Sequence, residues 1–121
     1  MEMQTSVVNL DYAQHFVARK QMQVIAIQAC RVVARPGSLV LAECATIFGQ
    51  AGSVIHAAAG TTAYAKKDCR VYAEFASTTY ARAGSIVEAE PGAVVYAEEG
   101  AIVRARSGAD VYPWARRAQR R

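Results

Sequence analysis

A hydrophobic and polar pattern with a period of eight residues runs along this chain. Counted from a turn residue at position 1, each unit has a small residue at position 2, a large aliphatic residue at position 4 and alanine at position 6. The clearest copies are Gly84–Ala89 and Gly92–Ala97. Positions 2, 4 and 6 have the spacing of a β-strand that points alternate side chains to one face. The pattern therefore predicts short strands, each followed by a turn.

The same frame extends back to the N-terminus with a single one-residue slip, which we place between Ala45 and Gly52. The turn residues up to the slip are then Thr5, Ala13, Gln21, Ala29, Gly37 and Ala45. Position 4 is large and apolar in all but two units: Val8, Phe16, Val24, Val32, Val40, Phe48, Ile55, Ala63, Val71, Thr79, Val87, Val95, Val103 and Val111. Position 6 is mostly alanine, with Gln50 in the unit of the slip. The frame predicts about fourteen strand-turn units.

Many short strands of nearly one sequence, none able to bury its face alone, indicate a β-solenoid whose coils stack on one another. A helix over 11–22 also fits the local spacing, but an eight-residue repeat would rotate by about 80° per unit on a helix. We therefore predict an all-β, single-domain solenoid over residues 1–115, followed by a basic tail over 116–121.

The number of strands in each coil is the open question. A three-sided coil of about 24 residues is favoured over a two-sided coil of about 16. Two facing sheets normally lie about 10 Å apart, and inward residues no larger than valine would leave a void between them. Charges at position 7 also alternate at the longer lag, in Arg19, Glu43, Lys66 and Glu90. Tyrosines favour the two-sided coil instead, because they recur every sixteen residues, namely Tyr64, Tyr80, Tyr96 and Tyr112.

Charge and composition narrow the function classes. The net charge is +4, and four arginines lie in the tail, so the rest of the chain is neutral and is neither a basic nucleic-acid platform nor an acidic mimic. A hydrophobic content of 53% excludes wholesale disorder. Three cysteines without Cys-x-x-Cys spacing predict reduced thiols. No apolar run reaches the roughly 18 residues of a membrane span, and we expect a cytoplasmic location.

The cadence Val-Tyr-Ala-x-x-Gly, as in Val95–Gly100, resembles the octapeptide β-solenoid repeats of bacterial and phage proteins. It is more distantly similar to bactofilins, whose solenoids polymerise. This resemblance covers nearly the whole chain and implies a shape, whereas function is left to the surface residues. Hexapeptide-repeat acyltransferases and the related carbonic anhydrases share the architecture, but they need a catalytic histidine or three zinc-binding histidines. This chain has two, His15 and His56, both at outward positions. We expect no enzyme activity, metal, cofactor or small-molecule substrate.

Outward apolar residues are the candidate binding residues. Tyrosines at position 5 and aliphatic residues at position 3 give the predicted protein interface: Tyr64, Tyr72, Tyr80, Tyr96, Tyr112, Ile86, Val94 and Ile102. Such residues either form ladders that stiffen the rod or provide an apolar contact face. We expect a homo-oligomer that also binds a protein partner, as a scaffold or inhibitor. The alternative is a nucleic-acid-associated module that grips phosphates through Arg116, Arg117, Arg120 and Arg121.

The C-terminal end carries two residues that are expected to block further strand pairing. Pro113 lacks an N–H donor, and Trp114 is predicted to fold over the last coil.

Overall fold

The computed structural model describes residues 6–10, 15–27 and 30–114, and its regular elements are all β-strands. Each strand occupies positions 3 to 6 of a repeat, often with a residue or two more. The fourteen strands are β1 (Ser6–Leu10), β2 (His15–Ala18), β3 (Met22–Ile27), β4 (Arg31–Ala34), β5 (Leu39–Glu43), β6 (Thr46–Gly49), β7 (Val54–Ala57), β8 (Thr62–Ala65), β9 (Arg70–Ala73), β10 (Thr78–Ala81), β11 (Ile86–Ala89), β12 (Val94–Ala97), β13 (Ile102–Ala105) and β14 (Asp110–Pro113).

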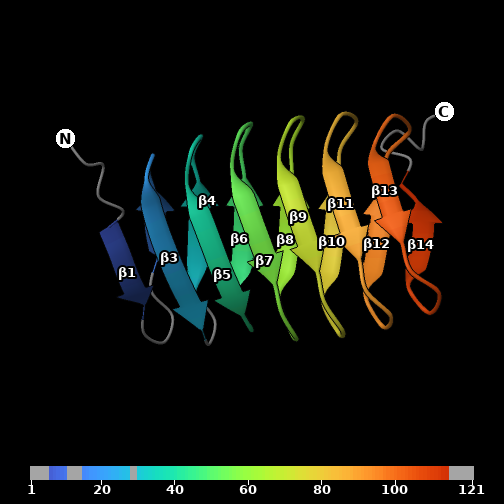
Figure 1. Cartoon of the computed structure of the whole chain (residues 1–121), viewed down its shortest axis with the longest axis horizontal. Coiled ribbons are helices and arrows are strands. Elements are labelled where there is room, and N and C mark those ends of the chain that lie inside the picture. The colour runs from blue at the N-terminus through green and yellow to red at the C-terminus, as the bar shows by residue number, and fades with distance from the viewer. Residues whose placement is uncertain (1–5, 11–14, 28–29, 115–121) are drawn as a thin grey trace, which may run out of the picture.

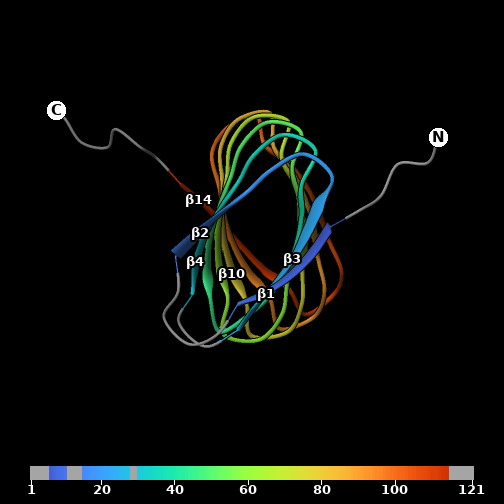
Figure 2. The ribbon, with the colours of Figure 1, turned by 90° about the vertical axis from the view of Figure 1, so that its left-hand side faces the viewer.

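Successive strands alternate between two parallel sheets, so each coil of the solenoid has two sides. The odd-numbered strands form sheet A in the order β1-β3-β5-β7-β9-β11-β13, and the even-numbered strands form sheet B in the order β2 to β14. Partners lie sixteen residues apart in most pairs, as in Tyr64 opposite Tyr80. Figure 1 shows the coils stacked into a rod, and Figure 2 shows the flattened coil with one sheet on each side. The β-solenoid is confirmed, and the preference for three sides is wrong.

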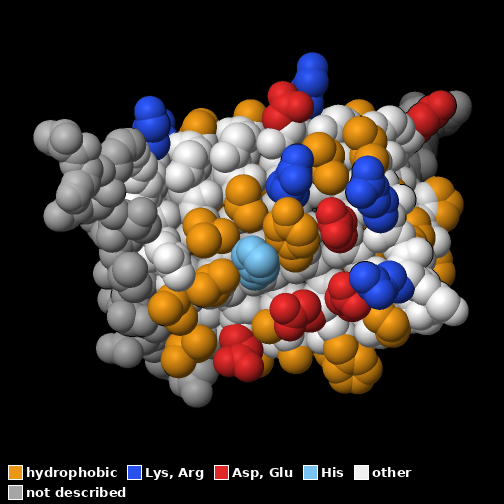
Figure 3. Space-filling model, in the orientation of Figure 1, with side chains coloured by type: hydrophobic (Ala, Val, Ile, Leu, Met, Phe, Trp, Pro, Cys, Tyr) orange, Lys and Arg blue, Asp and Glu red, His pale blue; other side chains and the backbone are white. Residues whose placement is uncertain are grey.

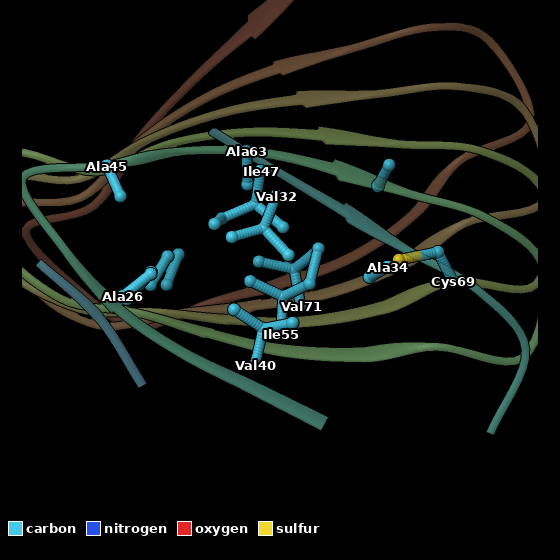
Figure 4. Close-up of a cluster of buried hydrophobic side chains, with 14 of the residues drawn as sticks. Ala26, Val32, Ala34, Val40, Ala45, Ile47, Ile55, Ala63, Cys69 and Val71 are labelled. Atoms are coloured by element: carbon cyan, nitrogen blue, oxygen red, sulfur yellow. The ribbon is translucent and has the colours of Figure 1, made fainter. Parts of the chain in front are cut away.

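The expected void between two sheets does not arise, because the side chains are graded in size across the coil. In Figure 4, Val32 and Ile47 of sheet B point toward Val40, Ile55 and Val71 of sheet A along the middle of the interior. All five of these side chains have no exposed surface. The smaller residues lie toward the two corners, where the sheets converge: Ala26 and Ala45 at one, Ala34 and Cys69 at the other (Figure 4). A lens-shaped cross-section therefore packs densely with small residues.

The one-residue slip lies earlier than predicted, in the turn between β5 and β6. Cys44, not Ala45, has the left-handed backbone of a position-1 residue, with φ 54°. Strand pairing places Ile47 opposite Val32 and Phe48 opposite Val33. Ile47 is therefore the buried position-4 residue, whereas Phe48 points outward with 38% exposure. Gly49 takes position 6 in place of Gln50.

Apart from the shortened turn between β5 and β6, the described turns share one conformation and extend the ladders around the corners. The position-2 N–H donates to the position-7 carbonyl three residues earlier, as from Ser38 to Arg35 at 3.1 Å. Position 1 has positive φ, between 80° and 100° at the seven glycines, and Pro36 and Pro91 precede two of them. These are the features of a type II turn. From Gln21 to Gly92, each described position-1 N–H also donates to the turn one coil later on the same edge, as from Gly84 to Gly100 at 3.0 Å.

Serine at position 2 reinforces this turn from inside the coil. The buried hydroxyls of Ser38, Ser53, Ser77 and Ser85 each donate to the carbonyl three residues earlier at 2.7 Å. Each of these carbonyls thus accepts from both the N–H and the hydroxyl of the same serine, and the buried hydroxyl has a partner.

Within the described residues, no strand pairs with the outer side of the last coil. Among the described strands, β13 and β14 each pair on one side only. Val111 of β14 is 42% exposed, whereas its partner Val95 is fully buried. Trp114 does not cover this end, since its ring lies 5.4 Å from that of Tyr80 on β10. The prediction that Trp114 closes the last coil is wrong, because its side chain lies back along sheet B.

Candidate interaction surfaces

The predicted interface residues divide between the two outer faces of the rod. Sheet B carries Tyr64, Tyr80, Tyr96, Tyr112 and Val94, whereas sheet A carries Tyr72, Ile86 and Ile102. A three-sided coil would have divided these residues among three faces. All are at least partly exposed, so the prediction that they point outward is confirmed.

Sheet B presents an unbroken column of apolar side chains at position 5. The strand register stacks Val17, Val33, Phe48, Tyr64, Tyr80, Tyr96 and Tyr112 along the rod. The five rings form a stacked ladder, with centroids 5.0 to 5.5 Å apart and planes within 26° of parallel. Because the register repeats in every coil, each ring is held by the rings before and after it.

Trp114 builds a groove against this ladder. Its ring meets Tyr80 edge-on, and the Arg82 guanidinium lies 5.9 Å from its centroid in a cation–π contact. The groove has a volume of about 350 Å³, and its walls include Phe48, Tyr64, Tyr80, Lys66, Arg82 and Trp114. A second hollow of about 650 Å³ continues along the same face toward β2, between Val17, Val33 and Phe48. Sheet B is thus hollowed, aromatic and flanked by cations.

Sheet A is chemically mixed by comparison. His56 stacks on Tyr72, with ring centroids 4.7 Å apart. Strand pairing then continues this column with Glu88 and Arg104. Figure 3 shows the sheet A face, where hydrophobic, basic and acidic side chains alternate. This face has no continuous aromatic column.

The two histidines and the three cysteines lie in the described part of the chain. His15 is exposed on β2, and His56 is engaged with Tyr72 on the opposite sheet. Over residues 6–10, 15–27 and 30–114, no three of His, Cys, Asp and Glu come together in a possible metal site. None of the three cysteines forms a disulfide: Cys30 and Cys69 are buried and Cys44 is exposed. Burial raises the pKa of the Cys69 thiol, and its hydrogen bond with Ser53 has the smaller, opposite effect.

Two features of the site were missed from the sequence. Phe48 was assigned to the core because the slip was placed one unit late, so its membership of the aromatic ladder was hidden. The groove was missed because Trp114 was assigned to the open end. The sixteen-residue recurrence of tyrosine carried the correct register, and it would have placed the whole column on one face.

The predicted nucleic-acid residues, Arg116, Arg117, Arg120 and Arg121, lie outside the described residues. Within the described part of the chain there is no helix that is long and apolar enough to cross a membrane. No family model, no curated protein and no solved structure matches this chain.

Proposed function

We propose that this protein is a non-enzymatic structural rod that self-associates and binds a protein partner through its outward faces, chiefly that of sheet B. The observation that carries the proposal is the continuous apolar column from Val17 to Tyr112. Val17, Phe48, Tyr64 and Tyr112 are 38 to 46% exposed in the single chain. A contiguous apolar surface of this kind is typical of an interaction site.

The ladder is suited to binding because it is rigid before the partner arrives. Stacked rings on paired strands have little rotamer freedom left to lose, so ordering costs on association are small. Tyrosine also combines a large apolar ring with a hydroxyl that can hydrogen-bond at a wet rim. The flanking Lys66 and Arg82 favour a partner with carboxylates beside its apolar residues.

The repeat supports the same role by analogy. Its resemblance to octapeptide β-solenoids of bacteria and phage, and more distantly to bactofilins, fits a scaffold or inhibitor that works in the cytoplasm. A fold of this kind supplies a shape, and the side chains on its surface determine what it binds.

The experiment introduces charge into the ladder. The double variant Tyr64→Glu, Tyr80→Glu is expected to shift the sedimentation velocity profile at micromolar concentration toward the 13.0 kDa single chain. His56→Glu with Tyr72→Glu is the matched control, since it breaks the stacked pair on sheet A and leaves sheet B intact. Circular dichroism of both variants reports whether the fold is kept.

An unchanged size distribution in the folded sheet B variant would exclude this face as the self-association surface. A wild-type chain that stays a monomer at these concentrations would contradict self-association altogether.

A further inference from the structure

The turns line the two long edges of the rod, and the two edges differ in charge. Turns that lead from sheet B to sheet A follow β2, β4, β6, β8, β10 and β12, and they lie along the upper edge in Figure 1. Turns that lead from sheet A to sheet B lie along the lower edge. We call these the basic edge and the acidic edge.

The basic edge is positive along most of its length and negative at its C-terminal end. Its charged residues, in order along the rod, are Arg19, Lys20, Arg35, Lys66, Lys67, Asp68, Arg82, Glu98 and Glu99. All are exposed except Glu98, which is half-buried and accepts a hydrogen bond from the Ala83 N–H at 2.9 Å.

The acidic edge has the opposite pattern. Its described charged residues are Glu43 at the end of β5, Glu74 and Glu90 in turns and, at the C-terminal end, Arg106. All four are exposed, and Arg106 lies 3.6 Å from Glu90 on its own edge. Figure 3 shows acidic side chains gathered along the lower part of the face.

The two edges complement each other coil by coil. Arg35 lies in the turn before β5 and Glu43 lies at its end, and the turns on either side of β11 carry Arg82 and Glu90. Around β9, Lys66 and Lys67 outweigh Asp68 on one side, opposite Glu74 on the other. Around β13 the signs reverse, with Glu98 and Glu99 before the strand and Arg106 after it. The two turns around β7, 50–52 and 58–60, are both neutral.

Other alignments of the two edges lose this match. A shift of one coil in one direction sets Arg82 against Arg106, and a shift in the other direction sets Glu98 against Glu90. A fully overlapped antiparallel arrangement sets Arg19 and Lys20 against Arg106, and a shift by one coil that avoids this contact leaves three coils with opposite charges. The parallel, unshifted alignment gives four such coils, β5, β9, β11 and β13, and none with like charges.

We propose that the basic edge of one copy binds the acidic edge of a second copy, with the two rods parallel and in register. The proposal deepens the self-association proposed above by naming a second surface for it. Each edge of a copy contacts a different edge of its neighbour, so the contact is heterologous and repeats into a flat array of rods side by side. Exposed ion pairs stabilise little one at a time, but a row of matched charges selects partner, direction and register.

Phe75 provides an independent sign that the acidic edge is covered. It is 69% exposed at the tip of the turn after β9, the largest exposure among the exposed large hydrophobic side chains. In the proposed register, its ring meets the basic-edge turn that holds Lys67. A lysine ammonium over an aromatic face is a favourable contact.

Charge reversal tests the pairing. Variant one, Arg35→Glu with Lys67→Glu, makes both edges acidic around β5 and β9 and leaves the groove on sheet B unchanged. Variant two, Glu43→Lys with Glu74→Lys, makes both edges basic around the same strands. Each alone is expected to weaken lateral association by about tenfold or more in sedimentation velocity at low salt. An equimolar mixture of the two is expected to associate again, because each then finds a complementary neighbour.

Matched controls change the same net charge away from the edges. Arg70→Glu with Arg104→Glu matches variant one, and Glu88→Lys with Asp110→Lys matches variant two. Both controls alter strands rather than turns, and both are expected to keep wild-type lateral association. Failure of the mixed variants to associate while each remains folded would overturn the proposal.

Register is tested by cross-linking. Cys44 is exposed on the acidic edge, in the turn after β5, and Pro36 lies in the basic-edge turn before β5. Pro36→Cys is expected to form disulfide-linked ladders with Cys44 of neighbouring copies under mild oxidation. Ala83→Cys, three coils further along the basic edge, is expected not to link to Cys44. Linking of Ala83→Cys but not Pro36→Cys would contradict the register.

The experiments distinguish a failure of the proposed function from a failure of edge pairing. Loss of association in the Tyr64→Glu, Tyr80→Glu variant but not in the edge variants would leave the proposed function standing and overturn edge pairing. The opposite result would assign self-association to the edges. If variant one lost binding to a DNA duplex while its size distribution matched wild type, the basic edge would be a polyanion site instead.

Discussion

At position 1 of the repeat, the backbone needs a positive φ, and this explains which residues are tolerated there. Glycine takes it without steric cost, but Gln21, Cys44, Asp68 and Ala76 adopt the same region, with φ between 54° and 66°. The surrounding ladders impose the conformation on them. The sequence frame placed Ala45 rather than Cys44 at position 1. It therefore assigned Phe48 instead of Ile47 to the buried position 4.

At Gly49, neighbouring side chains limit the size of the residue that fits. This glycine stands at position 6, where most units have alanine. A Cβ at Gly49 would lie 2.5 Å from the Cys69 sulfur and 2.7 Å from Ile55 Cδ1. The larger thiol at the corner thus leaves room only for glycine beside it.

Thr79 places a hydroxyl where other units have an aliphatic side chain. It is fully buried, and within the described structure its Oγ1 has no hydrogen-bond partner. Thr79→Val is expected to raise the free energy of unfolding by about 1 kcal/mol, because it removes an unsatisfied polar group and keeps the shape. Urea denaturation measures the change.

Ser77→Ala is the opposite-signed control for Thr79→Val. It removes a hydroxyl that does donate, to the Glu74 carbonyl at 2.7 Å, and is expected to lower stability by about 1 kcal/mol. A loss of stability in Thr79→Val would mean that its hydroxyl is hydrogen-bonded in solution.

At the scale of the strand, alternation predicted the elements and their inward faces well. The alternation could not determine the number of strands per coil. An eight-residue repeat is compatible with a coil of two strands or of three. The charges at position 7 favoured the wrong number of strands per coil, because exposed flexible side chains do not need to stack in register. The tyrosines were the better guide, because rings on adjacent strands gain from direct stacking.

Adjacent valines on β12 test the inward and outward assignment. Val95 is fully buried and Val94 is half-buried on the outer face. Val95→Asp is expected to cost about 3–5 kcal/mol of unfolding free energy, because it buries an unpaired carboxylate. Val94→Asp is expected to cost about 1 kcal/mol or less. Thermal and urea unfolding compare the two.

Val111→Asp tests whether the loss of stability depends on the position of the valine along the rod. Val111 is the partner of Val95 in the open last coil and is 42% exposed. Its substitution is expected to cost less than that of Val95. Equal losses at Val95 and Val111 would mean that the last coil is covered in solution.

As a whole, the molecule is one-dimensional, since each strand pairs only with the strands one coil away. Stability is then a sum of coils and of the contacts between neighbours, and opening begins at the ends. The sequence predicted this stacked architecture because every unit repeats the same inward residues. It could not predict which surfaces share a face, since this depends on the sixteen-residue register.

Hydrogen exchange is expected to show this gradient. Amides of β7–β10 in the middle of the rod should exchange most slowly, and those of β13 and β14 at the open end should exchange much faster. Mass spectrometry on the Tyr64→Glu, Tyr80→Glu variant at high salt, where edge pairing is also screened, gives the profile of the single rod. Uniform protection along the rod would contradict opening from the ends.

The sequence repeats every eight residues, but the structure repeats every sixteen. Removing or duplicating sixteen residues would change the length of the rod by one coil, about 4.8 Å, and leave every column in place. Removing eight would move all later strands to the opposite sheet, dividing the aromatic ladder between two faces and exchanging the basic and acidic edges. Inherited changes in rod length are therefore expected to come in steps of sixteen, so that the length of such a chain can evolve while its surfaces are kept.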